Sequence, residues 1–393
     1  MKRYIGTVVR GIRTPIVKSG DDLVEVVFNS MLDALESENI QMRDQDVVAV
    51  TESLVARSQG NYADTDQIAK DINSKFDSDI GLVFPILSRN RFSVILRAIA
   101  QTNKKIHILL SYPSDEMGNC LMDERILYQK DINPYSEVLS EEEYTELFGK
   151  EVKHRFTGID YVNLYKEIAP NCEIHFSNNP KTILKFTKDI LVCSVHSRKM
   201  VKQELIDAGA NKVYGLDEIL TESVDGSGYN SEYGLLGSNL SSDHSIKLFP
   251  RDGQPFVEAL QKKLCDYSNK QIEVMIYGDG AFKDPVGKIW ELADPVVSPA
   301  YTEGLKGTPN EIKIKYIADT ELSDVDDETA QEILKEKISN KDNDLTGTSE
   351  TLGTTPRQIT DLLGSLCDLT SGSGDKGTPV VFIQGYFDNF ASI

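Results

Sequence analysis

A strand, a proline turn and a capped helix at the start of the chain constrain its fold more than any other stretch. An apolar run over residues 4–9 leads to TPIVKSGDDL at residues 14–23, and an amphipathic helical pattern then continues to about residue 35. Pro15 fixes the turn, and Asp21 or Asp22 is a natural N-cap. Because the first amides of a helix attract anions, this turn is suited to holding a phosphate, although a purely structural turn has the same pattern.

Strand patterns alternate with helical patterns over the rest of the chain. We expect strands at 46–51, 106–111, 173–176, 190–195, 272–277, 312–318 and 379–384. We expect helices at 65–74, 91–100, 141–148, 199–208, 255–267, 327–338 and 356–369. A capping box of Ser140 and Glu143 marks the start of the helix at 141–148. This alternation predicts a mixed α/β (α+β) fold.

The length of 393 residues suggests two or three domains. We expect residues 1–61 and 227–393 to form one core, and residues 62–226 to form an inserted domain of βαβ type. Glycine, serine and asparagine at 224–230 indicate a flexible hinge. Residues 324–355 form an acidic tract, in which we expect one surface helix and a mobile loop.

The charge and cysteine content limit the partners of the protein. A formal net charge of -20 disfavours binding to nucleic acid or to an anionic membrane. The five cysteines are odd in number and include no CxxC pair, which is typical of reduced thiols in a cytoplasm. No apolar run reaches the roughly 18 residues that a membrane helix needs. We therefore expect a soluble, cytoplasmic protein.

Four carboxylates are candidate ligands for a hard cation such as Mg²⁺ or Mn²⁺, namely Glu52, Asp279, Asp319 and Asp375. The first three follow expected strands, and ligands bind at strand ends in α/β sheets. Asp279 also lies between two glycines, which let a phosphate come close to the backbone. Each of these residues alone is more often an ordinary turn residue, so a metal site requires that two or three of them converge.

A glycine-rich turn at 372–377 has GxGxxG spacing. A dinucleotide-binding fingerprint follows a strand and precedes a helix, whereas here the order is reversed. The turn is therefore interpreted only as a flexible segment whose backbone amides could contact phosphates.

The histidines form no recognisable catalytic pattern with serine, cysteine or aspartate. His107 and His175 fall in strand patterns, where we expect core or edge residues with satisfied hydrogen bonds. His196 precedes a helix, and Arg198 and Lys199 with the helix amides could hold an acidic ligand there. The alternative is a solvated helix start.

Six sequence blocks occur in the order found in one known family. These blocks are TPIVKSGDDL, DVVAVTESLVARSQG, GLLGSN, LFPRDGQPFVEALQKKL, VMIYGDG and GDKGTPVVFIQG. Over residues 4–60 and 233–385 the chain resembles the coenzyme F-420-0:L-glutamate ligase (gamma-glutamyl ligase) family. The resemblance implies a mixed α/β fold that forms a homodimer. It also implies that GTP and a divalent cation activate a carboxylated acceptor, a deazaflavin coenzyme or a folate-like molecule, to which L-glutamate is joined.

The resemblance also assigns roles to individual residues. It implies nucleotide contacts from Thr14, Pro15, Ile16, Val17, Glu52, Ser53, Arg57 (a lysine in the family), Asn239, Gly374, Asp375, Lys376 and Gly377. Asp279 matches a metal-binding aspartate, with Asp319 and Asp375 as further candidates, and Lys18 and Arg57 are the expected phosphate-stabilising side chains.

Three positions depart from the family pattern. Leu236 stands where the family has a metal-binding aspartate, Gly280 replaces a threonine and Ser373 replaces a glutamate. Because leucine cannot coordinate a hard cation, a catalytically weak binding or regulatory protein is the alternative to a ligase. A nucleotide-free α/β sensor is the third possibility.

Overall fold

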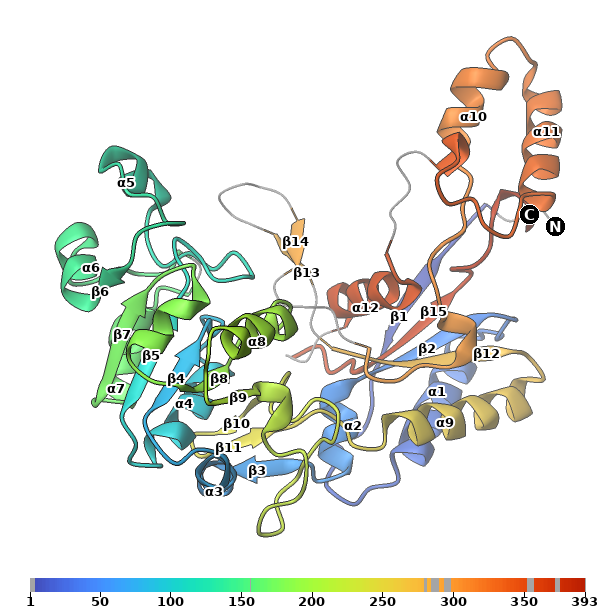
Figure 1. The fold of residues 1–393 in the computed structure, drawn as a ribbon. Coiled ribbons are helices and arrows are strands. Elements are labelled where there is room, and N and C mark those ends of the chain that lie inside the picture. Colours follow the sequence, from blue (N-terminus) through green and yellow to red (C-terminus); the bar gives the residue numbers. More distant parts are fainter. Residues whose placement is uncertain are drawn as a thin grey trace. The chain divides into compact units, whose positions relative to one another are not determined.

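The computed structural model describes residues 4–155, 157–278, 281–283, 290–292, 298–351, 357–371 and 375–392 (Figure 1). It divides into two compact units. Unit 1 comprises Met1–Val55 and Asp252–Ile393, and unit 2 comprises Ala56–Arg251. Unit 2 thus also takes in residues 56–61 and 227–251, which the sequence pattern assigned to the other part of the chain.

A four-stranded sheet forms the centre of unit 1. Its order is β1 (Val8–Ile12), β15 (Val380–Gln384), β2 (Asp46–Thr51) and β12 (Ile272–Tyr277). β15 runs antiparallel to both of its neighbours, whereas β12 runs parallel to β2. A strand near the end of the sequence therefore lies between the first two strands. The first strand begins later than the run at 4–9 predicted.

Alternate residues of these strands pack on opposite faces of the sheet, as the period of two in a strand requires. Val48 and Val50 pack in one cluster with α1 (Leu23–Ser37) and α9 (Gly253–Ser268). Val47 and Ala49 pack in a second cluster with α12 (Ile359–Thr370). Both faces of β2 are therefore buried, which explains its continuous apolar sequence.

The first helix begins as the sequence predicts. The Asp22 side chain accepts a hydrogen bond from the Glu25 amide at 3.2 Å and caps α1. Asp21 instead accepts from the Lys18 amide at 2.7 Å and closes the turn before the helix. Val27, Met31 and Leu35 repeat at helical spacing and are buried in unit 1.

The strand expected at 312–318 is wrong, because α10 (Ile314–Glu321) occupies most of that range. Ile317 and Leu322 pack with Leu334 of α11 (Asp327–Ser339) in a small separate cluster. A short apolar alternation fits either secondary structure, and packing against α11 favours the helix. α11 itself confirms the surface helix that the acidic tract predicts.

The remaining elements of unit 1 are short. They are β13 (Ala281–Lys283) paired with β14 (Trp290–Leu292), and the 3-10 turns η3 (Glu303–Leu305), η4 (Ser349–Thr351) and η5 (Phe390–Ser392). A further helix, α2 (Glu52–Ser58), follows β2 directly. The sequence placed this segment at a strand end but did not predict its helix.

Unit 2 contains a six-stranded sheet. Its order is β6 (Leu139–Ser140), β7 (Cys172–Phe176), β5 (Ile106–Leu110), β4 (Ile80–Val83), β8 (Asp189–Val192) and β9 (Lys212–Gly215). All these strands are parallel except β6 at the edge. The chain leaves β4 toward β5 and β7, and later returns to β8 and β9 on its other side. This doubly wound order agrees with the expected βαβ units.

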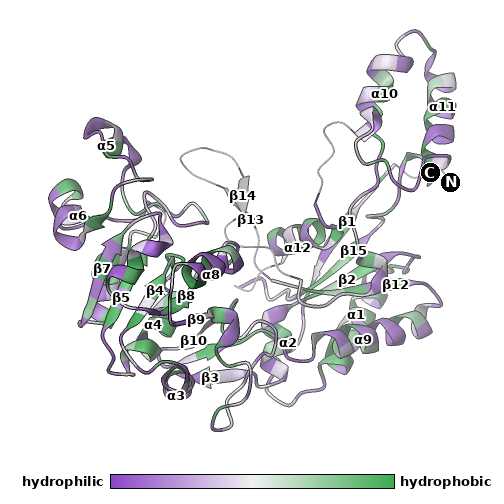
Figure 2. Cartoon of the chain, in the orientation of Figure 1, coloured by the Kyte–Doolittle hydropathy of each residue, from purple (hydrophilic) through white to green (hydrophobic). Residues whose placement is uncertain are grey.

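Helices cover both faces of this sheet. The helices of unit 2 are α3 (Thr65–Lys75), α4 (Phe92–Ala100), α5 (Glu124–Gln129), α6 (Glu141–Phe148), α7 (Tyr161–Ile168) and α8 (Arg198–Asp207), with the 3-10 turns η1 (Pro180–Lys185) and η2 (Leu216–Glu218). Ile80 and Leu82 pack with α3, α4 and α7, whereas Val83 packs with α8. Figure 2 shows the central strands β4 and β8 in hydrophobic colours. The predicted capping box of Ser140 and Glu143 is present.

A second, three-stranded sheet in unit 2 has the order β10 (Asn239–Ser242), β11 (Ser245–Lys247) and β3 (Tyr62–Asp64). β3 lies near the start of unit 2 in the sequence, whereas β10 and β11 lie near its end, so this sheet joins the two ends of the unit. Among the helices that the structure describes, none is long and apolar enough to cross a membrane.

Candidate functional site

Pairing of β1 with β15 brings the predicted first turn close to the C-terminal loop. Gly11 pairs with Val381, and a Cβ atom on Gly11 would lie 2.9 Å from the Thr378 Cβ atom. The Arg13 Nε atom donates a hydrogen bond to the Lys376 carbonyl at 3.4 Å. Two segments that the resemblance assigns to the nucleotide, about 360 residues apart, therefore lie side by side in unit 1.

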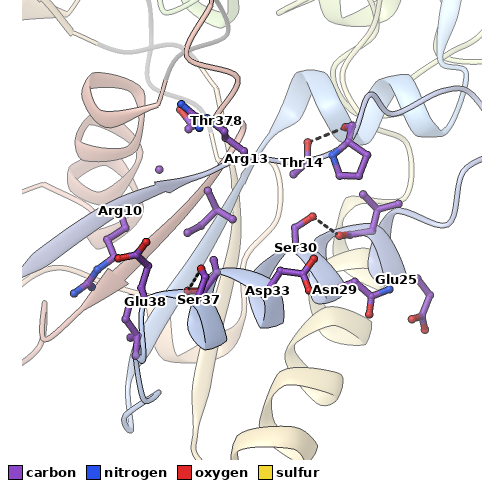
Figure 3. Close-up of a pocket in the computed structure, with 16 residues that line it drawn as sticks. Arg10, Arg13, Thr14, Glu25, Asn29, Ser30, Asp33, Ser37, Glu38 and Thr378 are labelled. Atoms are coloured by element: carbon purple, nitrogen blue, oxygen red, sulfur yellow. Dashed lines mark hydrogen bonds between the residues drawn. The ribbon is translucent and has the colours of Figure 1, made fainter.

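A groove of about 860 Å³ lies between β1 with its following turn and α1. Its lining includes the cations Arg10 and Arg13, the acids Glu25, Asp33 and Glu38, and the polar residues Thr14, Asn29, Ser30, Ser37 and Thr378. Figure 3 shows Arg10 and Glu38 at one end of the groove, with Thr14 and Glu25 toward the other end. The volume suits a small-molecule ligand.

A chain of hydrogen bonds holds Arg10 from the side of the core. The Arg10 Nη1 atom donates to the Gln384 Oε1 atom at 2.9 Å, and the Gln384 Nε2 atom donates to the Asp46 Oδ2 atom at 2.8 Å. Burial raises the pKa of Asp46, and the bond from Gln384 opposes that rise. The guanidinium of Arg10 is therefore positioned by residues of three neighbouring strands.

Arg13 is placed differently from Arg10. It is exposed, and its Nε partner is a neutral carbonyl rather than a carboxylate. That bond orients the side chain without cancelling its charge, so Arg13 is suited to attracting an anion. The sequence analysis did not identify Arg10 and Arg13 as site residues. The signal that could have identified them is a pair of arginines around β1 in a chain with a strongly negative net charge.

The other residues of the first turn have contrasting environments. Thr14 and Pro15 line the groove, whereas Ile16 and Lys18 are exposed and lie outside its lining. The Val17 side chain is buried in the apolar core of unit 1. Of the four nucleotide contacts predicted in the first turn, Thr14 and Pro15 therefore line this groove.

The second predicted segment lies in α2. Glu52 is buried in the first turn of this helix, and Ser53 follows it half-buried. Arg57 is exposed in the last turn. Glu52 and Ser53 belong to unit 1 and Arg57 belongs to unit 2.

The third predicted block lies in unit 2. Asn239 is half-buried, begins β10 and pairs with Lys247. Leu236 is 7% exposed and packs in the main apolar cluster of unit 2. The position at which the resemblance implies a metal-binding aspartate is therefore part of a hydrophobic core.

Two of the three predicted metal ligands, Asp319 and Asp375, lie in the described part of the chain. Asp319 is exposed on α10, and Asp375 is exposed near the C-terminal loop. Asp279 and Gly374 lie outside the described residues. Within the described segments, the group of three His, Cys, Asp or Glu side chains close enough to hold one ion comprises His107, Glu173 and His175. Asp319 and Asp375 therefore belong to no three-ligand group among the described residues, and a site that also includes Asp279 stays a prediction.

The start of α8 is exposed at His196 and Lys199, but its first amides are already bound by a carboxylate of the same chain. Glu116 accepts hydrogen bonds there from the His196 amide at 3.3 Å, the Ser197 amide at 3.2 Å and the Ser197 hydroxyl at 3.1 Å. It also accepts from the Val195 amide. Arg198 forms an ion pair with Asp217 at 2.9 Å. The acidic group at this helix start is thus supplied by the chain itself.

The expectation of satisfied histidines in the strands is also wrong. Among the described residues, the buried His107 Nδ1 and His175 Nε2 atoms make no hydrogen bond, although the Glu173 Oε2 atom lies 3.3 Å from the His107 Nδ1 atom. Such groups are uncommon in native structures and require a physical explanation.

The fold and groove define a mixed α/β protein with two compact units and a polar, mixed-charge groove beside the edge strand of unit 1. The chain belongs to the F420-0:gamma-glutamyl ligase family, whose model matches residues 11–385. This match confirms the resemblance found in the sequence and identifies a family of gamma-glutamyl ligases. Among curated proteins, no significant match is found.

Proposed function

We propose that this protein uses GTP to join L-glutamate to a small carboxylated acceptor, either a deazaflavin coenzyme or a folate-like molecule. The observation that carries the proposal is the convergence of Thr14, Pro15, Lys376 and Thr378 beside the cationic side chain of Arg13. In a chain with a net charge of -20, a cation placed between two nucleotide-assigned segments favours a phosphate there.

The proposed reaction has two steps. A carboxylate oxygen of the acceptor attacks the γ-phosphorus of GTP, the bond to the β-phosphate oxygen breaks, and an acyl phosphate and GDP form. The neutral amine of L-glutamate then attacks the acyl carbon, phosphate leaves with the bonding electrons, and the amine loses a proton to form the amide. Activation is required because direct amide formation from a free carboxylate is unfavourable in water.

Protein side chains would contribute by holding charge. We assign Arg13 and Lys18 to the transferring phosphoryl group, because both are exposed cations close to the first turn. Arg57 on α2 is a separate candidate for phosphate contact. A divalent cation, Mg²⁺ or Mn²⁺, would offset the phosphate charge when bound. We propose Asp279 as its ligand, with Asp319 and Asp375 as further candidates.

A second candidate function is a binding or regulatory protein that retains the nucleotide without turning it over. The burial of Leu236 favours this candidate, because a family metal ligand is replaced by a core residue. Under either function we propose a cytoplasmic homodimer that binds neither nucleic acid nor membranes.

The deciding experiment measures phosphate release by the purified full chain with GTP and Mn²⁺. The ligase predicts release that requires both a carboxylated acceptor and L-glutamate, together with a product whose mass equals the two substrates minus water. Tight GTP binding without release identifies the binding protein. No thermal shift with any nucleotide overturns both candidates and leaves the nucleotide-free sensor.

A further inference from the structure

Two histidines and a glutamate lie together on one face of the parallel sheet in unit 2. His107 on β5 pairs directly with Glu173 on β7, and His175 follows Glu173 by two residues. Residues two apart in a strand point to the same face of the sheet. The strand register therefore brings the three side chains together, independently of the nucleotide-assigned segments.

The positions of their polar atoms resemble those of an ion-binding group. The His107 Nδ1 atom lies 3.3 Å from the Glu173 Oε2 atom, and one ligand atom from each residue lies within 4.8 Å of the others. His107 is only 4% exposed, and within the described part of the chain neither its Nδ1 atom nor the His175 Nε2 atom makes a hydrogen bond, although the Nδ1 atom has the ion-pair contact with Glu173. An unpaired buried nitrogen is costly, and a bound cation would satisfy both nitrogens.

An aromatic neighbour orients both imidazoles, and an imidazole nitrogen is a common metal ligand. The Phe186 ring stacks on His175 at 3.8 Å between centroids and on His107 at 5.3 Å.

A pocket of about 650 Å³ provides access to this group. Glu173 and His175 line it, together with Glu141, Glu142 and Glu146, so its walls attract cations. The Lys105 Nζ atom lies 2.7 Å from the Glu173 Oε1 atom and holds the oxygen that does not face His107. Glu173 is 47% exposed, which leaves its carboxylate room to adjust.

We propose that His107, Glu173 and His175 bind a divalent transition-metal ion of the zinc type. Two ligands about 2.0–2.1 Å from a tetrahedral ion lie about 3.4 Å apart, close to the separation of His107 and Glu173. Imidazole nitrogens favour Zn²⁺ and related ions, whereas Mg²⁺ prefers a shell of oxygen ligands. Three protein ligands leave a fourth coordination position for water or a ligand atom.

The test uses the full chain, treated with a chelator and then titrated with Zn²⁺ without nucleotide. We expect one tightly bound ion per chain and a rise in Tm. Co²⁺ should give weak visible absorption bands from nitrogen and oxygen ligands, without the near-ultraviolet bands of thiolate coordination. Excess Mg²⁺ should not displace the bound ion, which separates this site from the nucleotide-associated cation.

Three variants and a matched control assign the ligands. Glu173→Gln and His175→Gln should each weaken Zn²⁺ binding at least 10-fold, whereas His244→Gln, in an exposed turn of unit 2, should leave it unchanged. Lys105→Met should strengthen binding, because it frees the Glu173 carboxylate. Absence of Zn²⁺ binding, or equal affinity in Glu173→Gln, His175→Gln and the unmodified chain, overturns the proposal. Because Glu173 is half-exposed, its variant should fold, and circular dichroism checks this.

Discussion

The Gln384 side chain donates a hydrogen bond to the buried Asp46 carboxylate at 2.8 Å and accepts one from Arg10 at 2.9 Å. One amide thus connects a carboxylate in the core of unit 1 with a guanidinium in the groove. Burial nevertheless raises the pKa of Asp46 above the ordinary value of 3.8, so ionisation of this residue opposes folding.

Asp46→Asn should therefore change the pH dependence of stability. Between pH 3.8 and its raised pKa, folded Asp46 binds more protons than unfolded Asp46, so its contribution to stability falls as pH rises. The asparagine variant lacks this loss. The free energy of unfolding of the variant should therefore increase, relative to that of the unmodified chain, as pH rises from about 4 through the raised pKa of Asp46. Urea unfolding at several pH values measures the difference, and two parallel curves would contradict the expectation.

Leu236→Asp should destabilise unit 2 rather than restore a family metal site. Leu236 is buried among apolar side chains, where an unpaired carboxylate is strongly unfavourable. We expect a loss of about 3 kcal/mol or more in the free energy of unfolding. Leu236→Met, which preserves volume and polarity, should lose less than about 1.5 kcal/mol. Equal stability of the two variants in denaturant titrations would show that position 236 is not part of the core.

Arg13→Ala should weaken GTP binding about 10-fold or more, because a charge-assisted hydrogen bond contributes about 1.5–3 kcal/mol. Isothermal titration calorimetry measures the change. Arg125→Ala is the matched control, since Arg125 is an exposed arginine of unit 2 that is paired with Asp123 at 2.6 Å. An equal loss in both variants would assign the effect to net charge and would remove Arg13 from the nucleotide site.

The cysteines should divide into two classes by reactivity. Cys172, Cys193 and Cys367 are buried, and burial raises the pKa of Cys172 to about 11 and raises the pKa of the other two as well. Cys120 and Cys265 are half-buried. Brief alkylation of the native chain at about pH 8 should label only these two, whereas all five should react in denaturant. Peptide mass spectrometry reads the outcome, and rapid native labelling of Cys193 would contradict the described packing.

Local sequence signals predicted most of the elements but not their long-range pairing. Asp22 and the spacing of Val27, Met31 and Leu35 specify α1 without reference to the rest of the chain. The strand β4 (Ile80–Val83) was missed, because four apolar residues show no period of their own. The groove was missed because Arg10 and Thr378 are brought together by strand pairing, which no local pattern encodes.

The candidate site shows the same division. The resemblance identified the first turn and the last loop, and the structure brings Thr14 near Thr378 in one groove. The resemblance could not reveal the cluster of His107 and His175, because the positions of their side chains depend on the register of β5 against β7. Each histidine alone has the sequence environment of an ordinary strand residue.

The position of β15 between β1 and β2 affects the order in which the protein can fold during synthesis. Unit 2, residues 56–251, has left the ribosome well before Val380 is made, so it can fold while the sheet of unit 1 still lacks a central strand. Until then the nascent chain carries β1 without a partner, and an unpaired strand edge is a target for aggregation. A chain released before Val380 is made would therefore have one finished unit and one open sheet.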